Sequence, residues 1–320
     1  MKAPWFWRRD GILPVVLSPL AGVYAAATAR RVAQAGWPAP VPVICCGNAS
    51  AGGAGKTTLA LDLGARLVAR GRRVAFLTRG YGGRIAGRVR PEHGAAAAGD
   101  EALLLAAVAP TYVGADRAVT ARLAVADGAE VLVMDDGLQN PTLAKDFSFL
   151  VIDGAAGFGN NRVIPAGPLR EPVSAAASRC QAAVLIGADA CGALAASPVG
   201  LPVLRAELRA SAELAGVRVF AFAGIGRPEK FFGTLEAAGA VVVGRRGFAD
   251  HHVFSTVECE AVLRDAAGLG AMAVTTPKDA VRLPAALRGR VRVVGVELVW
   301  EDAALLERLL DDVLAKGMTP

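Results

Sequence analysis

A glycine-rich segment followed by a lysine and two threonines carries the clearest chemical signal in the sequence. It reads GNASAGGAGKTT over residues 47–58, between the apolar run 41–46 and a helical run that begins LALDLGARL. Glycines let backbone N–H groups turn towards phosphate oxygens, and the N-terminus of the following helix adds its dipole. The pattern therefore predicts a nucleotide-phosphate loop that includes Gly52, Gly53, Ala54, Gly55 and Thr58.

Two side chains of this loop are expected to meet the ligand directly. Lys56 should contact the β- and γ-phosphates of ATP, and Thr57 should coordinate Mg²⁺. The strict pattern GxxxxGK[ST] requires glycine at position 50, where this chain has Ser50. The flanking strand and helix nevertheless fit the prediction.

A pair of carboxylates supplies the second half of such a site. Asp135 and Asp136 end the apolar run that begins at Glu130, and they are followed by Gly137, Leu138 and Gln139. Carboxylates at a strand end can hold Mg²⁺ or its waters beside a threonine hydroxyl. The alternative is an ordinary solvated strand end.

These residues must be positioned by an alternation of short apolar runs and helical stretches. The expected strands span residues 41–46, 74–78, 130–134, 147–152 and 182–186, and helical stretches follow Gly55, Gly99 and Asp116. Near-continuous apolar strands separated by helices indicate a parallel sheet covered on both faces. The sequence therefore predicts an α/β fold with a P-loop NTPase-like sheet.

A second alternation begins after residue 206. Strands are expected at 217–223, 241–243 and 271–275, with helices at 227–238, 256–267 and 302–315. The extended stretches 201–210 and 291–299 are expected to pair as a two-strand connection between lobes. We therefore predict an N-terminal segment over 1–30, a P-loop lobe over 31–206 and a smaller α/β lobe over 207–320.

The N-terminal segment has an uncharged stretch, residues 11–29, with arginine pairs on either side. A signal peptide, a spanning helix, an interfacial helix and a helix packed on its own domain all fit this pattern. ATP chemistry belongs in the cytosol and argues against export. We favour a membrane-surface segment that also packs on its own domain and places these side chains in the headgroup boundary: Trp5, Phe6, Trp7, Leu13, Leu17, Leu20 and Tyr24.

Composition excludes several other classes of protein. An apolar content of 53% is too high for a disordered chain, and five cysteines in 320 residues are too few for a disulfide scaffold. The formal net charge is +6, but the arginines form no stripe with interleaved aromatic residues. Nucleic acid is therefore not expected as a partner.

Further motifs occur in a fixed order and narrow the choice of family. They are LTRGYGGR (77–84), GDEALLLA (99–106), VGADR (113–117), MDDGLQNP (134–141), GFGNNRVIPAGPLREP (157–172), FADHH (248–252) and TTPKDAVRL (275–283). Together with the phosphate loop they resemble the tetraacyldisaccharide 4′-kinase family of lipid A biosynthesis, over about residues 4 to 300. The chain departs from that family's usual residues at Thr58, Ala102, Asn140 and Pro277.

The resemblance implies transfer of the γ-phosphoryl of ATP to the 4′-hydroxyl of an acylated glucosamine disaccharide 1-phosphate. It implies Asp100 as the base for that hydroxyl and His251 as its partner, in keeping with a reaction that needs mainly positioning and charge neutralisation. Lys56 would share the catalytic work. The metal and nucleotide ligands would come from a pool of polar side chains: Thr57, Glu101, Asp135, Asp136, Gln139 and Glu171. Arg79, Arg117 and Arg170 would be phosphate contacts, and Tyr81 would pack on sugar or base.

The implied location is the cytoplasmic face of the bacterial inner membrane, with no obligate protein partner. Two other functions remain open at this point. One is a membrane-associated switch ATPase, although Ala51 stands where such proteins carry a signature lysine. The other is a membrane-tethered nucleotide-binding scaffold, which would need neither Asp100 nor His251.

Overall fold

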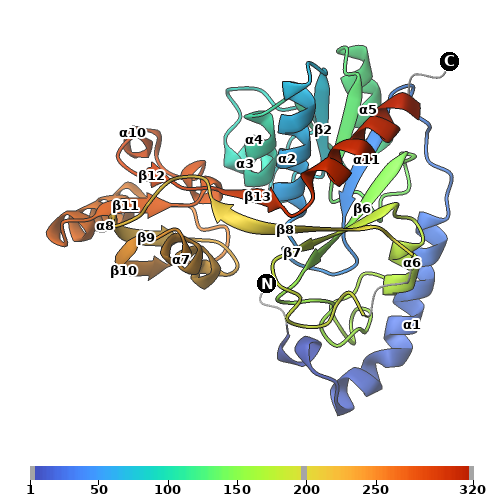
Figure 1. Ribbon diagram of the computed structural model, residues 1–320, viewed down its shortest axis with the longest axis horizontal. Helices are drawn as coiled ribbons and strands as arrows, with labels where there is room; N and C mark the ends of the chain where they lie inside the picture. Colours follow the sequence, from blue (N-terminus) through green and yellow to red (C-terminus); the bar gives the residue numbers. More distant parts are fainter. Residues whose placement is uncertain (1–3, 196–199, 317–320) are drawn as a thin grey trace.

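Two α/β lobes joined by a pair of antiparallel strands make up the computed structural model, which describes residues 4–195 and 200–316 (Figure 1). The larger lobe has a nine-stranded sheet in the order β13-β8-β7-β6-β1-β5-β2-β4-β3. Its strands are β1 (Val43–Gly47), β2 (Val74–Thr78), β3 (Gly87–Arg88), β4 (Thr111–Val113), β5 (Val131–Asp135), β6 (Phe147–Asp153), β7 (Ala182–Ile186), β8 (Val203–Ala210) and β13 (Val296–Trp300). All neighbouring strands run parallel except β13 with β8 and β3 with β4.

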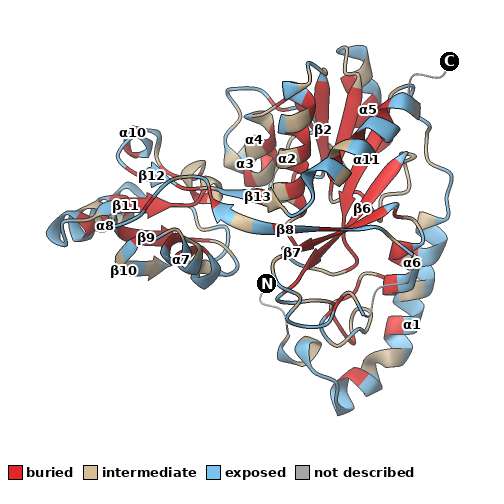
Figure 2. Ribbon diagram, viewed as in Figure 1, coloured by how far each residue is buried: buried red, intermediate tan, exposed pale blue. Residues whose placement is uncertain are grey.

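Helices cover both faces of this sheet, as the apolar strands predicted. One face packs against α2 (Lys56–Ala69), α4 (Asp100–Ala106) and α11 (Ala303–Lys316), and the other against α5 (Arg117–Ala126) and α6 (Val173–Ala177). Successive side chains of a strand point to opposite faces of the sheet. The neighbouring residues Cys45 and Cys46 therefore lie in different core clusters, Cys46 on the face covered by α2 and Cys45 on the face covered by α5. Figure 2 shows the strands of this sheet buried between the two helical layers.

The smaller lobe is built around a four-stranded parallel sheet in the order β10-β9-β11-β12. Its strands are β9 (Arg218–Ala223), β10 (Val241–Gly247), β11 (Met272–Thr275) and β12 (Arg292–Val293). Phe231, Phe232 and Leu235 of α7 (Pro228–Ala237) pack on one face, and α8 (Thr256–Gly268) covers the other. Two short helices, α9 (Pro277–Ala280) and α10 (Ala285–Arg288), follow β11.

The connection between the lobes has the predicted form. β8 pairs with β13 in antiparallel register from Ala206 opposite Trp300 to Ala210 opposite Val296. The chain therefore leaves the larger lobe along β8 and returns along β13. The two strands run side by side between the lobes in Figure 1.

The return of the chain changes the extent of the smaller lobe. The sequence analysis assigned all of 207–320 to the smaller lobe. In the structure, β13 is a strand of the larger sheet, and α11 packs on that sheet. The reason is amphipathic packing: Leu306, Leu310 and Val313 of α11 are buried in the core cluster that also contains α2. The first residues of the segment 1–30 and the last of 207–320 lie outside the described residues.

The N-terminal segment forms a short 3₁₀ turn, η1 (Trp5–Arg8), and the long helix α1 (Ile12–Val32). Only Pro14, Ala21 and Thr28 of α1 are buried. The helix lies along the outside of the larger lobe, where most of its surface is exposed in Figure 2. By length and composition it is the single helix of the described chain that could cross a membrane.

Candidate active site between the lobes

The loop after β1 has the backbone of a phosphate cradle. Gly52 and Gly55 have φ of 138° and 91°, in the region that favours glycine, and Gly55 is the N-cap of α2. A Cβ atom on Gly55 would lie 2.6 Å from Cδ1 of Ile186. The loop therefore leads directly into a 14-residue helix whose first N–H groups have no helical partner.

Lys56 and Thr57 point from this helix N-terminus towards the end of β5. Lys56 donates to the Gly52 carbonyl at 3.2 Å and lies 3.7 Å from Asp136, and the Thr57 hydroxyl donates to Asp135 Oδ2 at 3.0 Å. The register of the sheet explains this meeting, because Cys46 at the end of β1 is opposite Asp135 in β5. The predicted lysine, threonine and carboxylates therefore form one cluster.

Asp135 is the member of the cluster best suited to a cation. It is 1% exposed, and its Oδ1 atom has no hydrogen-bond partner in the described structure. Burial, together with the charges of Glu101 and Asp136, raises the pKa of Asp135 to about 7. Mg²⁺ is commonly held by one or two carboxylates plus a hydroxyl, phosphates and waters. A buried, unpaired carboxylate oxygen beside Thr57 fits that requirement.

Asp136 is held by two cations. Arg170 forms two hydrogen bonds with its carboxylate at 2.7 and 2.9 Å, and Lys56 is the second neighbour. Burial favours the neutral acid, but the charges of Lys56 and Arg170 outweigh it and hold the pKa of Asp136 below its usual range. Asp136 is therefore the ionised partner of the pair, and Arg170 is bound to it.

Two other predicted ligands, Gln139 and Glu171, form hydrogen bonds with protein groups. Gln139 donates to Glu171 at 2.8 Å and to the Asn48 carbonyl at 2.9 Å, and it accepts from Arg170 at 3.2 Å. Glu171 is 2% exposed and accepts two hydrogen bonds from Arg179. Both side chains therefore form hydrogen bonds with other protein groups and support the loop next to Asp136.

The predicted base lies at the start of α4. Asp100 is 4% exposed, and its Oδ1 accepts the backbone N–H of Glu101 at 3.0 Å. The preceding Gly99 has φ 86°, and a Cβ atom there would lie 2.6 Å from the Tyr81 carbonyl. The GDE motif therefore needs its glycine to place Asp100 against the RGYGG loop.

The smaller lobe supplies the partner of Asp100. Nδ1 of His251 is 3.1 Å from Asp100 Oδ2, although the two residues are 151 positions apart. His251 has φ 58°, and its backbone N–H donates to the Gly224 carbonyl at 3.0 Å. The ring centroids of His251 and Tyr81 are 6.0 Å apart. The predicted pair is therefore assembled across the two lobes.

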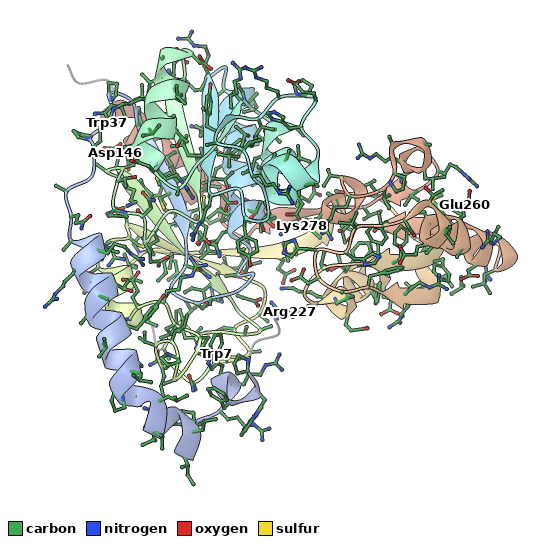
Figure 3. The ribbon with its side chains drawn as sticks, turned by 180° about the vertical axis from the view of Figure 1, so that it is seen from behind. Trp7, Trp37, Asp146, Arg227, Glu260 and Lys278 are labelled. Atoms are coloured by element: carbon green, nitrogen blue, oxygen red, sulfur yellow. The ribbon has the colours of Figure 1, made fainter. Side chains whose placement is uncertain are left out.

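Three basic residues that the sequence reasoning missed also cross between the lobes. Lys278 donates to Glu101 at 2.6 Å, and Arg282 lies 3.1 Å from Asp100. Arg227 donates to Asp153 at 2.7 Å and to the Gly53 carbonyl of the phosphate loop at 3.4 Å. In Figure 3, Lys278 and Arg227 lie on the side of the smaller lobe that faces the larger lobe.

These contacts follow from the way the two sheets face each other. Asp135 and Asp153 end strands of the larger sheet, while the segments that carry Arg227, His251 and Lys278 follow β9, β10 and β11. Carboxyl ends of parallel strands share one edge of a sheet, and ligands of open α/β sheets bind at that edge. The TTPKDAVRL motif was the available signal for Lys278 and Arg282, whereas nothing marked Arg227.

The charge balance across this interface is complementary. Burial by itself would lower the pKa of Lys278, but the charges of Glu101 and Asp100 outweigh it and raise that pKa. Burial likewise favours neutral Asp153, yet the hydrogen bond from Arg227 and the charge of Lys230 lower its pKa. Cations of the smaller lobe therefore neutralise carboxylates of the larger lobe around the phosphate loop.

The remaining predicted contacts are divided between surface and core. Arg79 and Tyr81 are exposed beside the site, and Tyr81 retains 72% of its accessible surface. Arg117 is buried and donates to the Gly114 carbonyl, and its Nε atom has no hydrogen-bond partner among the described residues. His93 instead accepts a hydrogen bond from the Arg90 backbone on another part of the lobe.

The loop with the motif GFGNNRVIPAGPLREP connects the site to the N-terminal segment. The Ala51 N–H donates to the Pro168 carbonyl, so the loop contacts the phosphate loop. On its other side, the Trp7 indole donates to the Pro165 carbonyl at 3.1 Å, and Arg162 binds Asp10 through two hydrogen bonds. Trp7, expected in the membrane boundary, is thus bound to the protein itself.

Comparison with known proteins gives a consistent result. The family model described as tetraacyldisaccharide-1-P 4′-kinase (LpxK) matches residues 13–315. A tetraacyldisaccharide 4′-kinase of Gluconacetobacter diazotrophicus is 57% identical over 325 residues, covering 99% of each chain. Another, from Rhodospirillum centenum, is 53% identical over 98% of this chain and 97% of the relative.

A solved structure extends the similarity to the fold. The crystal structure of an "apo" form of LpxK from Aquifex aeolicus in complex with ATP superposes with a TM-score of 0.74 and 26% sequence identity. The match covers 95% of this chain and 100% of that chain.

Proposed function

This chain belongs to the tetraacyldisaccharide-1-P 4′-kinase family, and we propose which of its residues carry out the reaction. It is an ATP-dependent kinase of lipid A biosynthesis that phosphorylates the 4′-hydroxyl of tetraacyldisaccharide 1-phosphate. The observation that carries the proposal is the 3.1 Å contact between Asp100, from the lobe that carries the phosphate loop, and His251, from the other lobe. The acceptor hydroxyl would approach Asp100 where the two lobes meet.

Asp100 accepts the proton of the acceptor hydroxyl as the oxygen attacks the γ-phosphorus. A carboxylate in this role needs only to be ionised, close and aligned, because phosphoryl transfer depends mainly on positioning and charge neutralisation. His251 orients the carboxylate through Nδ1 and offers Nε2 as an onward path for the proton. The contact at 3.1 Å supports this pairing.

Lys56 neutralises charge on the β- and γ-phosphates. In the structure its ammonium group contacts the Gly52 carbonyl and the Asp136 carboxylate, within the loop that binds phosphate. The backbone N–H groups of Gly53, Ala54, Gly55 and Thr58 bind the same oxygens. ATP is therefore held mainly by the larger lobe.

The residues that would hold Mg²⁺ are Thr57 and Asp135, with Asp136 and Glu101 beside them. The unpaired Oδ1 atom of Asp135 supports this choice. When bound, the ion supplies neutralisation of charge on the transferred phosphoryl group. Gln139 and Glu171 position Asp136 through Arg170 and the loop behind it.

The N-terminal segment brings the enzyme to the cytoplasmic face of the inner membrane. An acceptor with several acyl chains stays in the bilayer, because each buried methylene contributes about 0.8 kcal/mol. The exposed apolar residues of the segment would enter the headgroup boundary, while Arg30 and Arg31 would meet lipid phosphates. Its exposed members are Trp5, Ile12, Leu13, Val15, Val16, Leu20, Val23 and Tyr24.

The direct test is incubation of the purified protein with ATP labelled in its γ-phosphate and with a disaccharide 1-phosphate lipid. We expect label in a bis-phosphorylated lipid. Label appearing only as free phosphate would contradict kinase activity and favour a switch ATPase. An Asp100→Asn variant that binds ATP but does not label lipid would support the assignment of the base and exclude a scaffold role.

A further inference from the structure

Arg282 is a buried arginine of the smaller lobe whose guanidinium lies against the proposed base. Its side chain is 4% exposed, and its Nη2 atom is 3.1 Å from Asp100 Oδ2. The same carboxylate oxygen is 3.1 Å from Nδ1 of His251. Asp100 Oδ2 therefore has two partners, and both come from the other lobe.

The rest of the guanidinium binds the loops around His251. Nη1 donates to the Gly224 carbonyl at 2.9 Å and to the His252 carbonyl at 3.3 Å. The Gly224 carbonyl also accepts the backbone N–H of His251 at 3.0 Å. The guanidinium of Arg282 thus links Asp100 to the loop after β9, through Gly224, and to the turn that carries His251, through His252.

That turn needs such support because of its backbone. His251 has φ 58°, a conformation that non-glycine residues adopt only when surrounding contacts hold them there. Arg282 also donates through Nε to the Lys278 carbonyl at 2.9 Å, which anchors the guanidinium to its own loop. The Nε atom of Arg282 is thus held by its own loop, and the Nη1 and Nη2 atoms contact the groups around His251.

The charges explain why the arrangement depends on closure of the lobes. A buried guanidinium is stable only when paired and fully hydrogen-bonded. Within the smaller lobe, the acidic neighbour of Arg282 is Asp279, whose carboxylate lies 3.5 Å from Nη1. That carboxylate already accepts hydrogen bonds from the Gly224 N–H at 2.9 Å and from the Thr276 hydroxyl at 2.6 Å. The closer carboxylate, Asp100, belongs to the larger lobe. The full set of contacts therefore exists only when the lobes meet.

We propose that Arg282 is a positioning residue that aligns Asp100 with His251 when the lobes close. This inference rests on the proposed role of Asp100 as the base. Arg282 acts through Asp100 and the histidine turn, and it has no contact with the phosphate loop in the described structure. Its loss should therefore lower kcat and leave the KM for ATP nearly unchanged.

The first measurement compares Arg282→Gln, Arg282→Lys and a control, Arg288→Gln. Arg288 belongs to the same lobe and also donates to backbone carbonyls, those of Leu283 and Val281. Because a misplacement of about 1 Å can cost about a hundredfold in rate, we expect Arg282→Gln to lower kcat by about 30- to 100-fold. Arg282→Lys keeps the charge without the planar fork and should recover part of the loss. Arg288→Gln should keep its kcat.

A double-mutant cycle separates positioning from a merely structural role. If Arg282 acts through Asp100, its replacement by glutamine in an Asp100→Asn background should cost less than about threefold in kcat, since coupled residues are not additive. An equal loss in both backgrounds would overturn the proposal while leaving the base assignment intact. Full activity of Asp100→Asn alone would overturn the base assignment instead. Should Arg282→Gln fail to fold, as judged by circular dichroism, the same cycle is run with Arg282→Lys.

Discussion

The two halves of the site, one from each lobe, are constructed in different ways. The phosphate loop of the larger lobe is one continuous segment, in which Gly52, Gly55 and the start of α2 present backbone groups. The smaller lobe contributes side chains from three separate loops, after β9, β10 and β11. On the proposed assignment, a local motif is enough to bind phosphate, whereas the acceptor side of the reaction needs two lobes in contact.

This difference predicts separable effects of substitution. Changes in the phosphate loop should disturb the donor nucleotide and its transfer, and changes at the contact between Asp100 and the smaller lobe should reduce turnover alone. Arg227 is the residue that crosses this division, because it reaches the phosphate loop from the smaller lobe.

The largest effect is expected for Lys56→Ala. Loss of the ammonium group removes charge stabilisation of the transferred phosphoryl, which we expect to raise the barrier by roughly 4 kcal/mol, or about a thousandfold in kcat. Transfer of labelled phosphate to lipid measures the loss. Activity within tenfold of the unchanged protein would contradict the assigned role of Lys56.

Asp100→Asn should have the next largest effect. The amide cannot accept the hydroxyl proton, so we expect kcat to fall by about a hundredfold or more. ATP affinity, measured by equilibrium binding of a fluorescent analogue, should change by less than about twofold, since Asp100 touches no phosphate-loop residue in the described structure. A parallel loss of ATP affinity would erase the distinction between the two halves.

Arg227→Ala tests the residue that links the halves. Its guanidinium contacts Gly53 and Asp153, and we expect the KM for ATP to rise by about fivefold because the loop loses a charge-assisted contact. Arg245→Ala serves as the control, because Arg245 pairs with Glu229 and Glu236 within its own lobe. If Arg227→Ala lowers kcat and leaves the KM for ATP unchanged, Arg227 acts on the acceptor side of the reaction and not on ATP binding.

A smaller effect is expected from the exposed face of α1. Replacing Val16, Leu20 and Val23 by serine leaves the contacts of Trp7 and Arg162 in place, so it tests membrane docking without removing the segment. Binding to phosphatidylglycerol vesicles and activity on the long-chain acceptor should each fall by about threefold.

Two controls accompany the α1 variant. A short-chain soluble acceptor should be phosphorylated at the unchanged rate. Replacement of the exposed Val119 and Leu123 of α5 by serine should leave vesicle binding unaffected. Equal losses on both acceptors would mean that the helix packs structurally and does not dock the membrane.

The smallest effect concerns the stability of the smaller lobe. Hydrogen bonds from the Ser255 backbone and hydroxyl, and one with His252, lower the pKa of Glu258 from 4.5 to about 2. A lowered pKa in the folded state means that the ionised carboxylate stabilises the fold above pH 4.5, and that this contribution is lost as the pH falls towards 2. Glu258→Gln should therefore lower the urea midpoint at pH 7.

The difference between the two proteins should narrow as the pH falls below about 4.5. Glu260→Gln is the matched control, since Glu260 lies on the same helix, is exposed and has no side-chain hydrogen bond in the described structure. In Figure 3 it lies at the far end of the smaller lobe from the site. A gap that stays constant from pH 7 to pH 3 would contradict the role of the charge.

The sequence determined the features that depend on neighbouring residues. The loop 47–58 and the alternation of strands and helices are local patterns, and the expected β2 (Val74–Thr78) and β7 (Ala182–Ile186) agree with the structure. The pairing of residues 201–210 with 291–299 was also predicted, because both stretches looked extended and partly charged. The resemblance to a family supplied Asp100 and His251.

The tertiary structure decided what depends on distance in space. Sequence reasoning assigned α11 to the smaller lobe, since nothing in an amphipathic helix says which sheet it will cover. The resemblance placed Gln139 and Glu171 in the pool of ligands, and the packing of the chain decided which side chains they bind here, each other and, for Glu171, Arg179. Arg227 carried no local signal, and Arg282 lay in a motif, TTPKDAVRL, that gave it no role. Their partners, Asp153 and Asp100, lie in the other lobe, and charge complementarity across the lobes becomes visible only when both sheets are in place.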